Sequence, residues 1–277
     1  MFHRPTNFAE ALAVKARLGA KVTPIAGGTD LIVDLNRGAE LATDTLDLSA
    51  VADSDRIEQE GGSLLLSAGV TWAQMARLDI ECLAAAARSV GGPQIRNRGT
   101  IGGNLATASP AGDGSVALLA LEADLELSHA ARGSRWIKLT DFFLSYRQTA
   151  LADDELISRL RIPAGRSLQR TAWYKIGKRR AVNISLVCAA VARFADRRVC
   201  IAFGSVAPVP MRAFQTEGLI DGQPLTNELI DRAAEQATAE VQPIDDWRAS
   251  ADYRRAMCGV LTRRLLRQVQ TEQERSR

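Results

Sequence analysis

The sequence predicts an α+β fold in which two mixed helix-and-strand units are followed by a unit of two strands and two helices. Three observations support this prediction. Some segments carry apolar residues at helical spacing, whereas others are short apolar runs bounded by glycine or proline. The segments do not follow the regular strand–helix order of a doubly wound sheet. The length of 277 residues allows about two domains, each with its own core.

The first unit, about residues 1–55, opens with a helix over 11–18. Asn7 and Glu10 form a capping pair before this helix, and Gly19 ends it. We expect a buried strand over 22–26, a helix over 31–36 and a second strand over 46–48. A charged segment over 53–62 closes the unit.

The second unit, about residues 56–165, begins with an apolar strand over 63–68. Helices are expected over 72–79, 80–90 and 115–121, and strands over 124–128 and 155–162. Residues 91–113 contain six glycines and two prolines with little regular pattern. An irregular stretch of this length inside a compact domain indicates a functional loop. Pro163-Ala164-Gly165 predicts a domain boundary.

The third unit, residues 170–277, contains two apolar runs that we interpret as strands over 185–194 and 199–206. Helices are expected over 227–241 and 252–270. The arginines of the last helix are accompanied by Glu272 and Glu274, so they indicate a solvated helix face rather than a nucleic-acid site.

Composition excludes several classes of function. The formal net charge is only +3, and acidic and basic residues are interleaved without a basic stripe, which argues against nucleic-acid binding. No apolar run approaches the roughly 18–20 residues of a membrane span, and the start does not resemble a signal peptide. The four cysteines, Cys82, Cys188, Cys200 and Cys258, show no Cys-x-x-Cys spacing, so we expect neither a metal site nor disulfides. A cytoplasmic location is therefore expected.

The first candidate site is the run Ile25-Ala26-Gly27-Gly28-Thr29-Asp30-Leu31-Ile32, where a strand ends, two glycines turn the chain and a helix begins near Thr29 or Asp30. Glycine lets a ligand approach the backbone, and free N–H groups at a helix start favour anions such as a pyrophosphate. Taken alone, a Gly-Gly turn is more often plain structure.

The second candidate site is the stretch 100–113, in which Gly102-Gly103 again offers bare backbone. Asn104, Thr107 and Ser109 can form hydrogen bonds with hydroxyls and phosphate oxygens, and Asp113 suits a sugar-like hydroxyl. Neither run matches the P-loop or the Gly-x-Gly-x-x-Gly pattern. The two runs together therefore indicate a dinucleotide held by two separate glycine-rich loops.

No residue is predicted to be catalytic. His3 and His129 are isolated, and neither a nucleophile–base arrangement nor paired carboxylates are evident. This absence is typical of a protein whose chemistry belongs to its cofactor.

At this point the sequence resembles the FAD-binding medium subunits of the molybdenum hydroxylases, which include bacterial xanthine dehydrogenases and carbon monoxide dehydrogenase. The resemblance rests on Ala26–Leu31, on 94–104 (QIRNRGTIGGN), and on Ala108-Ser109-Pro110 with Asp113. Further matching segments are Asp141-Phe142-Phe143, Tyr146-Arg147, Glu155-Leu156-Ile157 and Arg161-Ile162-Pro163. The resemblance implies a two-lobed PCMH-type FAD-binding domain over 1–165. A carbon monoxide dehydrogenase flavoprotein-type C-terminal domain of antiparallel strands packed on helices would follow over 170–277.

The resemblance also implies a set of cofactor-binding residues. The segment Pro24–Ile32 would wrap the FAD pyrophosphate through Pro24, Ile25, Ala26, Gly27, Gly28, Thr29, Asp30, Leu31 and Ile32. The other side would be held by Thr100, Ile101, Gly102, Gly103 and Asn104, with Ile101 near the flavin. Asp113 would bond a ribityl or ribose hydroxyl, Ile157 would contact the adenine or flavin, and Lys175 would approach from the C-terminal domain. A solvated surface lysine is an equally weighted interpretation of Lys175.

The function that the resemblance implies is electron transfer. A large molybdopterin-binding subunit would oxidise the substrate, a small [2Fe–2S] subunit would pass electrons to FAD in this chain, and NAD+ or another acceptor would receive them. The alternatives are a stand-alone flavin or nucleotide-binding module without redox partners, and a stand-alone reductase, for which no acid is evident. Asn183-Ile184-Ser185 stands where the family often has an Asp-Ile-Ala-like run, which leaves the acceptor and the flavin potential open.

Overall fold

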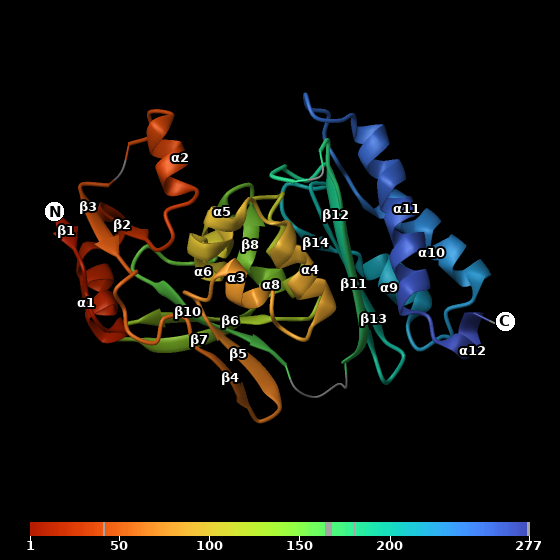
Figure 1. Cartoon of the computed structure of the whole chain (residues 1–277), viewed down its shortest axis with the longest axis horizontal. Coiled ribbons are helices and arrows are strands. Elements are labelled where there is room, and N and C mark those ends of the chain that lie inside the picture. Colours follow the sequence, from red (N-terminus) through yellow and green to blue (C-terminus); the bar gives the residue numbers. More distant parts are fainter. Residues whose placement is uncertain (41, 164–167, 180, 276–277) are drawn as a thin grey trace.

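The computed structural model describes residues 1–40, 42–163, 168–179 and 181–275. A small N-terminal unit, a central unit and a C-terminal unit follow one another along the long axis of the molecule (Figure 1). The predicted boundary Pro163-Ala164-Gly165 lies largely outside the described residues. Within the described part of the chain, no helix is long and apolar enough to cross a membrane.

The N-terminal unit is a three-stranded parallel sheet with a helix on each connection. Its elements are β1 (Phe2–His3), α1 (Phe8–Leu18), a short 3₁₀ turn (Gly19–Lys21), β2 (Val22–Ile25), α2 (Leu31–Asn36) and β3 (Asp44–Asp47), with strand order β1-β3-β2. The predicted cap is confirmed in part. Asn7 accepts a bond from the Glu10 N–H, but the Glu10 carboxylate accepts one from the Thr6 N–H rather than from Asn7. Gly19 ends the helix at a φ of 54°.

The central unit is an antiparallel sheet of order β4-β5-β10-β6-β7 that is covered by helices. The strands are β4 (Ile57–Glu60), β5 (Ser63–Ser67), β6 (Asp124–His129), β7 (Gly133–Lys138) and β10 (Leu156–Ile162). The helices are α3 (Trp72–Met75), α4 (Glu81–Ser89), α5 (Pro93–Arg98), α6 (Ile101–Thr107), α7 (Asp113–Ala120) and α8 (Leu139–Phe142), and a small hairpin pairs β8 (Phe143–Ser145) with β9 (Gln148–Thr149). The charged segment 53–62 contributes β4, an edge strand that exposes acidic side chains.

The expectation of an irregular stretch over 91–113 is wrong, because this stretch forms α5, α6 and the start of α7. Pro93 occupies the first turn of α5, and Thr100 caps α6 by accepting a bond from the Gly103 N–H. Helices of six and seven residues separated by glycine are too short to show a 3.6-residue apolar period.

The C-terminal unit is an antiparallel sheet of order β11-β12-β13-β14 packed on helices. It consists of β11 (Leu168–Ile176), β12 (Val187–Phe194), β13 (Val199–Gly204), β14 (Met211–Arg212), α9 (Phe214–Ile220), α10 (Asn227–Glu240), α11 (Ala251–Val269) and α12 (Glu272–Arg275). The predicted α+β class and this packing are confirmed. The two predicted strands are β12 and β13, and the two predicted helices are α10 and α11.

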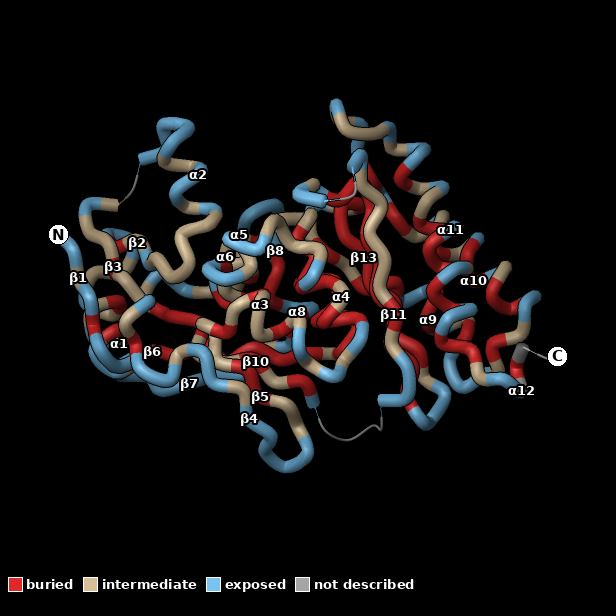
Figure 2. The backbone as a smooth tube through the Cα atoms, in the orientation of Figure 1, coloured by how far each residue is buried: buried red, intermediate tan, exposed pale blue. Residues whose placement is uncertain are grey.

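Both faces of the C-terminal sheet are covered, which explains why every residue of β12 and β13 is buried. Cys188, Ala190 and Ala192 face the central unit and join its core with α4 and α7. Val187, Ala189 and Val191 face the opposite way and pack in the core of α10 and α11. Figure 2 shows this continuous burial between the two layers of helices. The central and C-terminal units therefore share one apolar interface.

Candidate functional site

The two glycine-rich loops, which are distant in sequence, touch each other in the structure. A Cβ atom on Gly27 would lie 2.0 Å from the Arg98 carbonyl oxygen, and one on Gly99 would lie 3.2 Å from Thr29 Oγ1. Thr107 Oγ1, which donates to the Gly103 carbonyl, also lies 3.4 Å from Asp30 Oδ2. The site therefore forms where the N-terminal unit meets α5 and α6 of the central unit.

The first loop connects β2 to α2 and presents unused backbone donors. Among the residues that the structure describes, none accepts a hydrogen bond from the N–H groups of Gly27, Gly28, Thr29 or Asp30. Gly28 has a φ of +71°, a conformation that favours glycine. α2 begins at Leu31, the start of the helix expected over 31–36, and Asp30 is its N-cap residue. Neighbouring free N–H groups of this kind suit phosphate oxygens.

The second loop, residues 100–113, begins with the first turn of α6. The expected bare backbone at Gly102-Gly103 is found at Gly103 but not at Gly102. The N–H groups of Ile101 and Gly102 donate to the carbonyls of Val70 and Ala68 at 2.9 and 2.8 Å. A Cβ on Gly102 would lie 2.6 Å from that of Ala68, so Gly102 is required by packing. Gly103 is exposed, and a Cβ there would meet only Thr100 Oγ1, at 3.0 Å.

Asn104 carries the clearest unsatisfied polar atom of the second loop. Its Oδ1 is buried and has no hydrogen-bond partner in the described part of the chain. Buried side-chain oxygens are normally paired, so this atom suits a donor from a bound molecule. Together with the free N–H groups of the first loop, Asn104 fits a ligand that carries both phosphates and hydroxyls. Ile101 and Ile157 are buried members of the central core.

Asp113 and Lys175 form a buried ion pair across the interface between the central and C-terminal units. Lys175 Nζ lies 2.6 Å from Asp113 Oδ2, and the side chains are only 9% and 7% exposed. Interpreting Lys175 as a solvated surface lysine is therefore wrong. Alternation along β11 turns Lys175 towards the central unit, whereas Tyr174 packs against the core of α10 and α11.

Two serines that the sequence did not single out complete this cluster. Ser185 Oγ donates to Asp113 Oδ1 at 2.5 Å. Ser89 Oγ lies 3.3 Å from Asp113 Oδ2 and donates its proton to the Ala86 carbonyl at 2.7 Å. No local motif marks either serine, because each is brought to Asp113 by tertiary packing. The pKa of the nearby Cys188 thiol is raised well above its usual value, mainly by burial and further by the negative charge of Asp113. Cys188 therefore stays protonated and is no nucleophile.

Asn183, the departure from the family pattern, lies in the connection between β11 and β12. Its Nδ2 donates to the Arg179 carbonyl oxygen, and its side chain occupies the space into which a Cβ of Gly177 would extend. An aspartate at this position could not donate that bond, because an ionised carboxylate only accepts.

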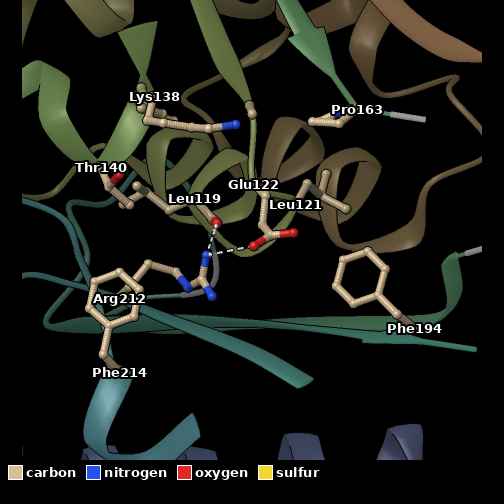
Figure 3. Close-up of a pocket in the computed structure, with 11 residues that line it drawn as sticks. Leu119, Leu121, Glu122, Lys138, Thr140, Pro163, Phe194, Arg212 and Phe214 are labelled. Atoms are coloured by element: carbon tan, nitrogen blue, oxygen red, sulfur yellow. Dashed lines mark hydrogen bonds and ion pairs between the residues drawn. The ribbon is translucent and has the colours of Figure 1, made fainter. Parts of the chain in front are cut away.

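A pocket of about 350 Å³ lies elsewhere, between the end of α7, the start of α8 and the strands and helix around Arg212 (Figure 3). None of the predicted cofactor residues lines it. Arg212 pairs with Glu217 at 2.5 Å and contacts the Leu119 carbonyl and Glu122. Arg198 is the main cause that lowers the pKa of Glu122, against the effect of burial. The charged side chains of this pocket take part in ion pairs, and the pocket is separate from the two loops.

Comparison with known proteins agrees with this arrangement. Residues 1–165 match the family model of the FAD binding domain in molybdopterin dehydrogenase, and residues 172–269 match that of the CO dehydrogenase flavoprotein C-terminal domain. The carbon monoxide dehydrogenase medium chain of Hydrogenophaga pseudoflava is 30% identical over 275 residues, which cover 96% of this chain and 95% of that relative. The nicotinate dehydrogenase FAD-subunit of Eubacterium barkeri is 36% identical over 220 residues, covering 75% and 74%.

Solved structures give the same result for the whole chain. Carbon monoxide dehydrogenase from Hydrogenophaga pseudoflava superposes with a TM-score of 0.88 at 29% identity and covers 96% of this chain and 95% of that chain. Quinoline 2-oxidoreductase from Pseudomonas putida 86 superposes with a TM-score of 0.86 at 26% identity, with coverage of 96% and 95%. The chain therefore belongs to the FAD-binding subunits of the molybdenum hydroxylases, the flavoprotein family that includes the carbon monoxide dehydrogenase medium chains and the xanthine dehydrogenase FAD-binding subunits.

Proposed function

We propose that this chain holds one FAD across its two glycine-rich loops and serves as the electron-transfer subunit of a heteromeric molybdenum hydroxylase. The observation that carries the proposal is the meeting of the loops, one with four free backbone donors and the other with the unpaired Oδ1 of Asn104. A dinucleotide needs both kinds of partner, because it carries phosphate oxygens and sugar hydroxyls together.

Each residue has a distinct task in this proposal. The N–H groups of Gly27–Asp30 would donate to phosphate oxygens, and Gly103 would let the ligand approach the α6 backbone. Asn104 Oδ1 and the Asp113 carboxylate would accept hydrogen bonds from hydroxyls, while Lys175 holds the charge of Asp113. FAD would supply the redox chemistry, accepting and releasing one or two electrons.

No residue of this chain would act as an acid or base on the organic substrate. Both histidines already have structural partners: His3 Nε2 lies 2.7 Å from Asp44, and His129 Nδ1 accepts bonds from two backbone N–H groups. The subunit names of the relatives support a division of labour. A large molybdopterin-binding subunit would oxidise the substrate. This chain would then pass electrons from the clusters of a small [2Fe–2S] subunit to NAD+ or another acceptor. Free, buried cysteines are consistent with the cytoplasm.

The test is the absorption spectrum of the purified chain, compared with those of Gly103→Val and Gly218→Val. Gly218 is a matched control, because a Cβ there meets nothing within 4 Å and the residue lies in α9, outside both loops. We expect oxidised-flavin bands in the wild type and in Gly218→Val, and their loss in a folded Gly103→Val protein. A colourless wild type that also ignores added FAD would refute the proposal.

Partners are tested by co-expression with the neighbouring genes. Copurification with a Cys-rich small protein and a large pterin-binding protein would support the electron-transfer role. A chain that binds FAD but neither associates with such proteins nor accepts their electrons would instead be the stand-alone flavin module.

A further inference from the structure

The carboxylate of Asp113 is held by two donors from the C-terminal unit. Lys175 of β11 donates to Oδ2 at 2.6 Å, whereas Ser89 Oγ of α4 lies 3.3 Å from the same oxygen and donates its proton to the Ala86 carbonyl. Ser185, which precedes β12, donates to Oδ1 at 2.5 Å. The Ser185 side chain that makes this bond is buried, with the residue only 1% exposed.

Ser185 is itself fixed on both sides by backbone hydrogen bonds. Its carbonyl accepts a bond of 3.1 Å from Ser205 Oγ, and the next residue, Leu186, donates its N–H to Ile176 at 2.8 Å. The buried guanidinium of Arg254 donates to the carbonyls of Leu186 and Ser205 at 3.0 and 2.8 Å. The Ser185 hydroxyl is therefore presented from a rigid backbone.

Ser205, which bonds to the Ser185 carbonyl, also forms a hydrogen bond with the second glycine-rich loop. Ser205 donates its N–H to the Pro110 carbonyl at 2.8 Å, three residues before Asp113. Ser205 has a φ of +65°, a conformation uncommon outside glycine, and its carbonyl, hydroxyl and N–H are all bonded. The C-terminal unit therefore forms hydrogen bonds with both ends of the segment 110–113.

Ser185 occupies one of the acceptor positions of the Asp113 carboxylate. An ionised carboxylate offers about four lone-pair positions, two on each oxygen. Lys175 takes one position of Oδ2 and Ser185 takes one of Oδ1, which leaves a position on Oδ1 for a ligand. Without the Ser185 hydroxyl, the carboxylate could rotate and chelate the Lys175 ammonium with both oxygens, and the free position would turn away from its present direction.

We propose that Ser185 is a positioning residue of the cofactor site: it fixes the Asp113 carboxylate so that one lone pair of Oδ1 faces a hydroxyl of FAD. The inference rests on the proposed function and extends it, because it makes the C-terminal unit part of the cofactor site. Ser185 acts through Asp113 and need not touch the cofactor.

The experiment measures the FAD dissociation constant of the full apo-chain by flavin fluorescence. The variants are Ser185→Ala, the isosteric pair Ser185→Thr and Ser185→Val, and Asp113→Asn alone and combined with Ser185→Ala. A hydrogen bond to a charged group corresponds to roughly a 10- to 100-fold change in affinity. We therefore expect Ser185→Ala and Ser185→Val to weaken FAD binding about 10-fold or more, whereas Ser185→Thr keeps the hydroxyl and stays close to wild type.

The double variant separates positioning from general stability. Adding Ser185→Ala to Asp113→Asn should weaken binding little further, because both changes remove the same interaction. Thr262→Val is the matched control: it removes a buried hydroxyl that bonds only within α11, and it should leave FAD affinity unchanged.

Two results would overturn the inference while the proposed function stands. One is equal FAD affinity of the Thr and Val variants, and the other is an undiminished effect of Ser185→Ala in the Asp113→Asn background. Failure of the wild-type chain to bind FAD would instead refute the proposed function itself. Should Ser185→Ala not fold, the Thr and Val pair decides alone, because those two side chains have nearly the same shape.

Discussion

Replacing Lys175 by methionine tests the buried ion pair between the central and C-terminal units. Methionine keeps much of the length and apolar character of the side chain but removes its charge, leaving the Asp113 carboxylate buried with the Ser185 hydroxyl as its close donor. Removing one partner of a buried ion pair costs about 3–5 kcal/mol, out of a total stability of about 5–15 kcal/mol for a typical domain. Both side chains are less than one tenth exposed, at 9% and 7%, so solvent screens the lost interaction little.

Urea denaturation of the apo-chain, followed by tryptophan fluorescence, measures this loss as a shift in midpoint with an unchanged slope. The double variant Asp113→Asn/Lys175→Met serves as the control, because it removes both charges and should recover most of the lost stability. A cost below about 1 kcal/mol for Lys175→Met, the value of an exposed pair, would refute the assignment of a buried pair. Equal stability of the single and double variants would also refute it.

Three further predictions concern other parts of the molecule. Gly27→Ala should destabilise the chain by about 1–3 kcal/mol or more in urea, because its Cβ would lie 2.0 Å from the Arg98 carbonyl, and a cost near zero would mean that the two loops do not touch. Burial opposes ionisation of Glu274, but hydrogen bonds from Arg193 and from two backbone N–H groups outweigh it and lower the pKa of Glu274 to about 2. Because the pKa of Glu274 is lower in the folded chain than its ordinary value of 4.5, ionised Glu274 stabilises the fold above pH 4.5, and this stabilisation is lost as the pH falls towards 2. The difference in unfolding free energy between wild type and Glu274→Gln should therefore be full at pH 6 and vanish near pH 2. A difference that does not change with pH would contradict the prediction. Burial raises the pKa of the Cys82, Cys200 and Cys258 thiols to about 12, and that of Cys188 well above its usual value. A thiol reagent at pH 8 should therefore label the chain only after unfolding, and rapid labelling of the native chain would show that a thiol is accessible.

Local signals in the sequence predicted the elements that have strong periodicity or clear ends. The capping residue Asn7 and Gly19 mark the limits of α1, and the apolar runs of β12 and β13 correspond to strands buried on both faces. The edge strands β7 and β11 were missed. Both mix charged and aromatic residues, and their sequences show no regular alternation of apolar and polar residues. The helices α5 and α6 were missed because each is less than two turns long.

The sequence by itself determined the family and the two loops, since Gly27-Gly28 and Gly102-Gly103 stand in local patterns that can be recognised without coordinates. Only the tertiary structure decided how the residues of the site combine. It showed that Gly102 serves packing whereas Gly103 is open, and that Lys175 is buried against Asp113. The reason is physical: helix caps and glycine turns depend on neighbours in the chain, whereas the Asp113 cluster joins residues 24 to 72 positions away from it, which only the folded sheet and helices bring within hydrogen-bond distance.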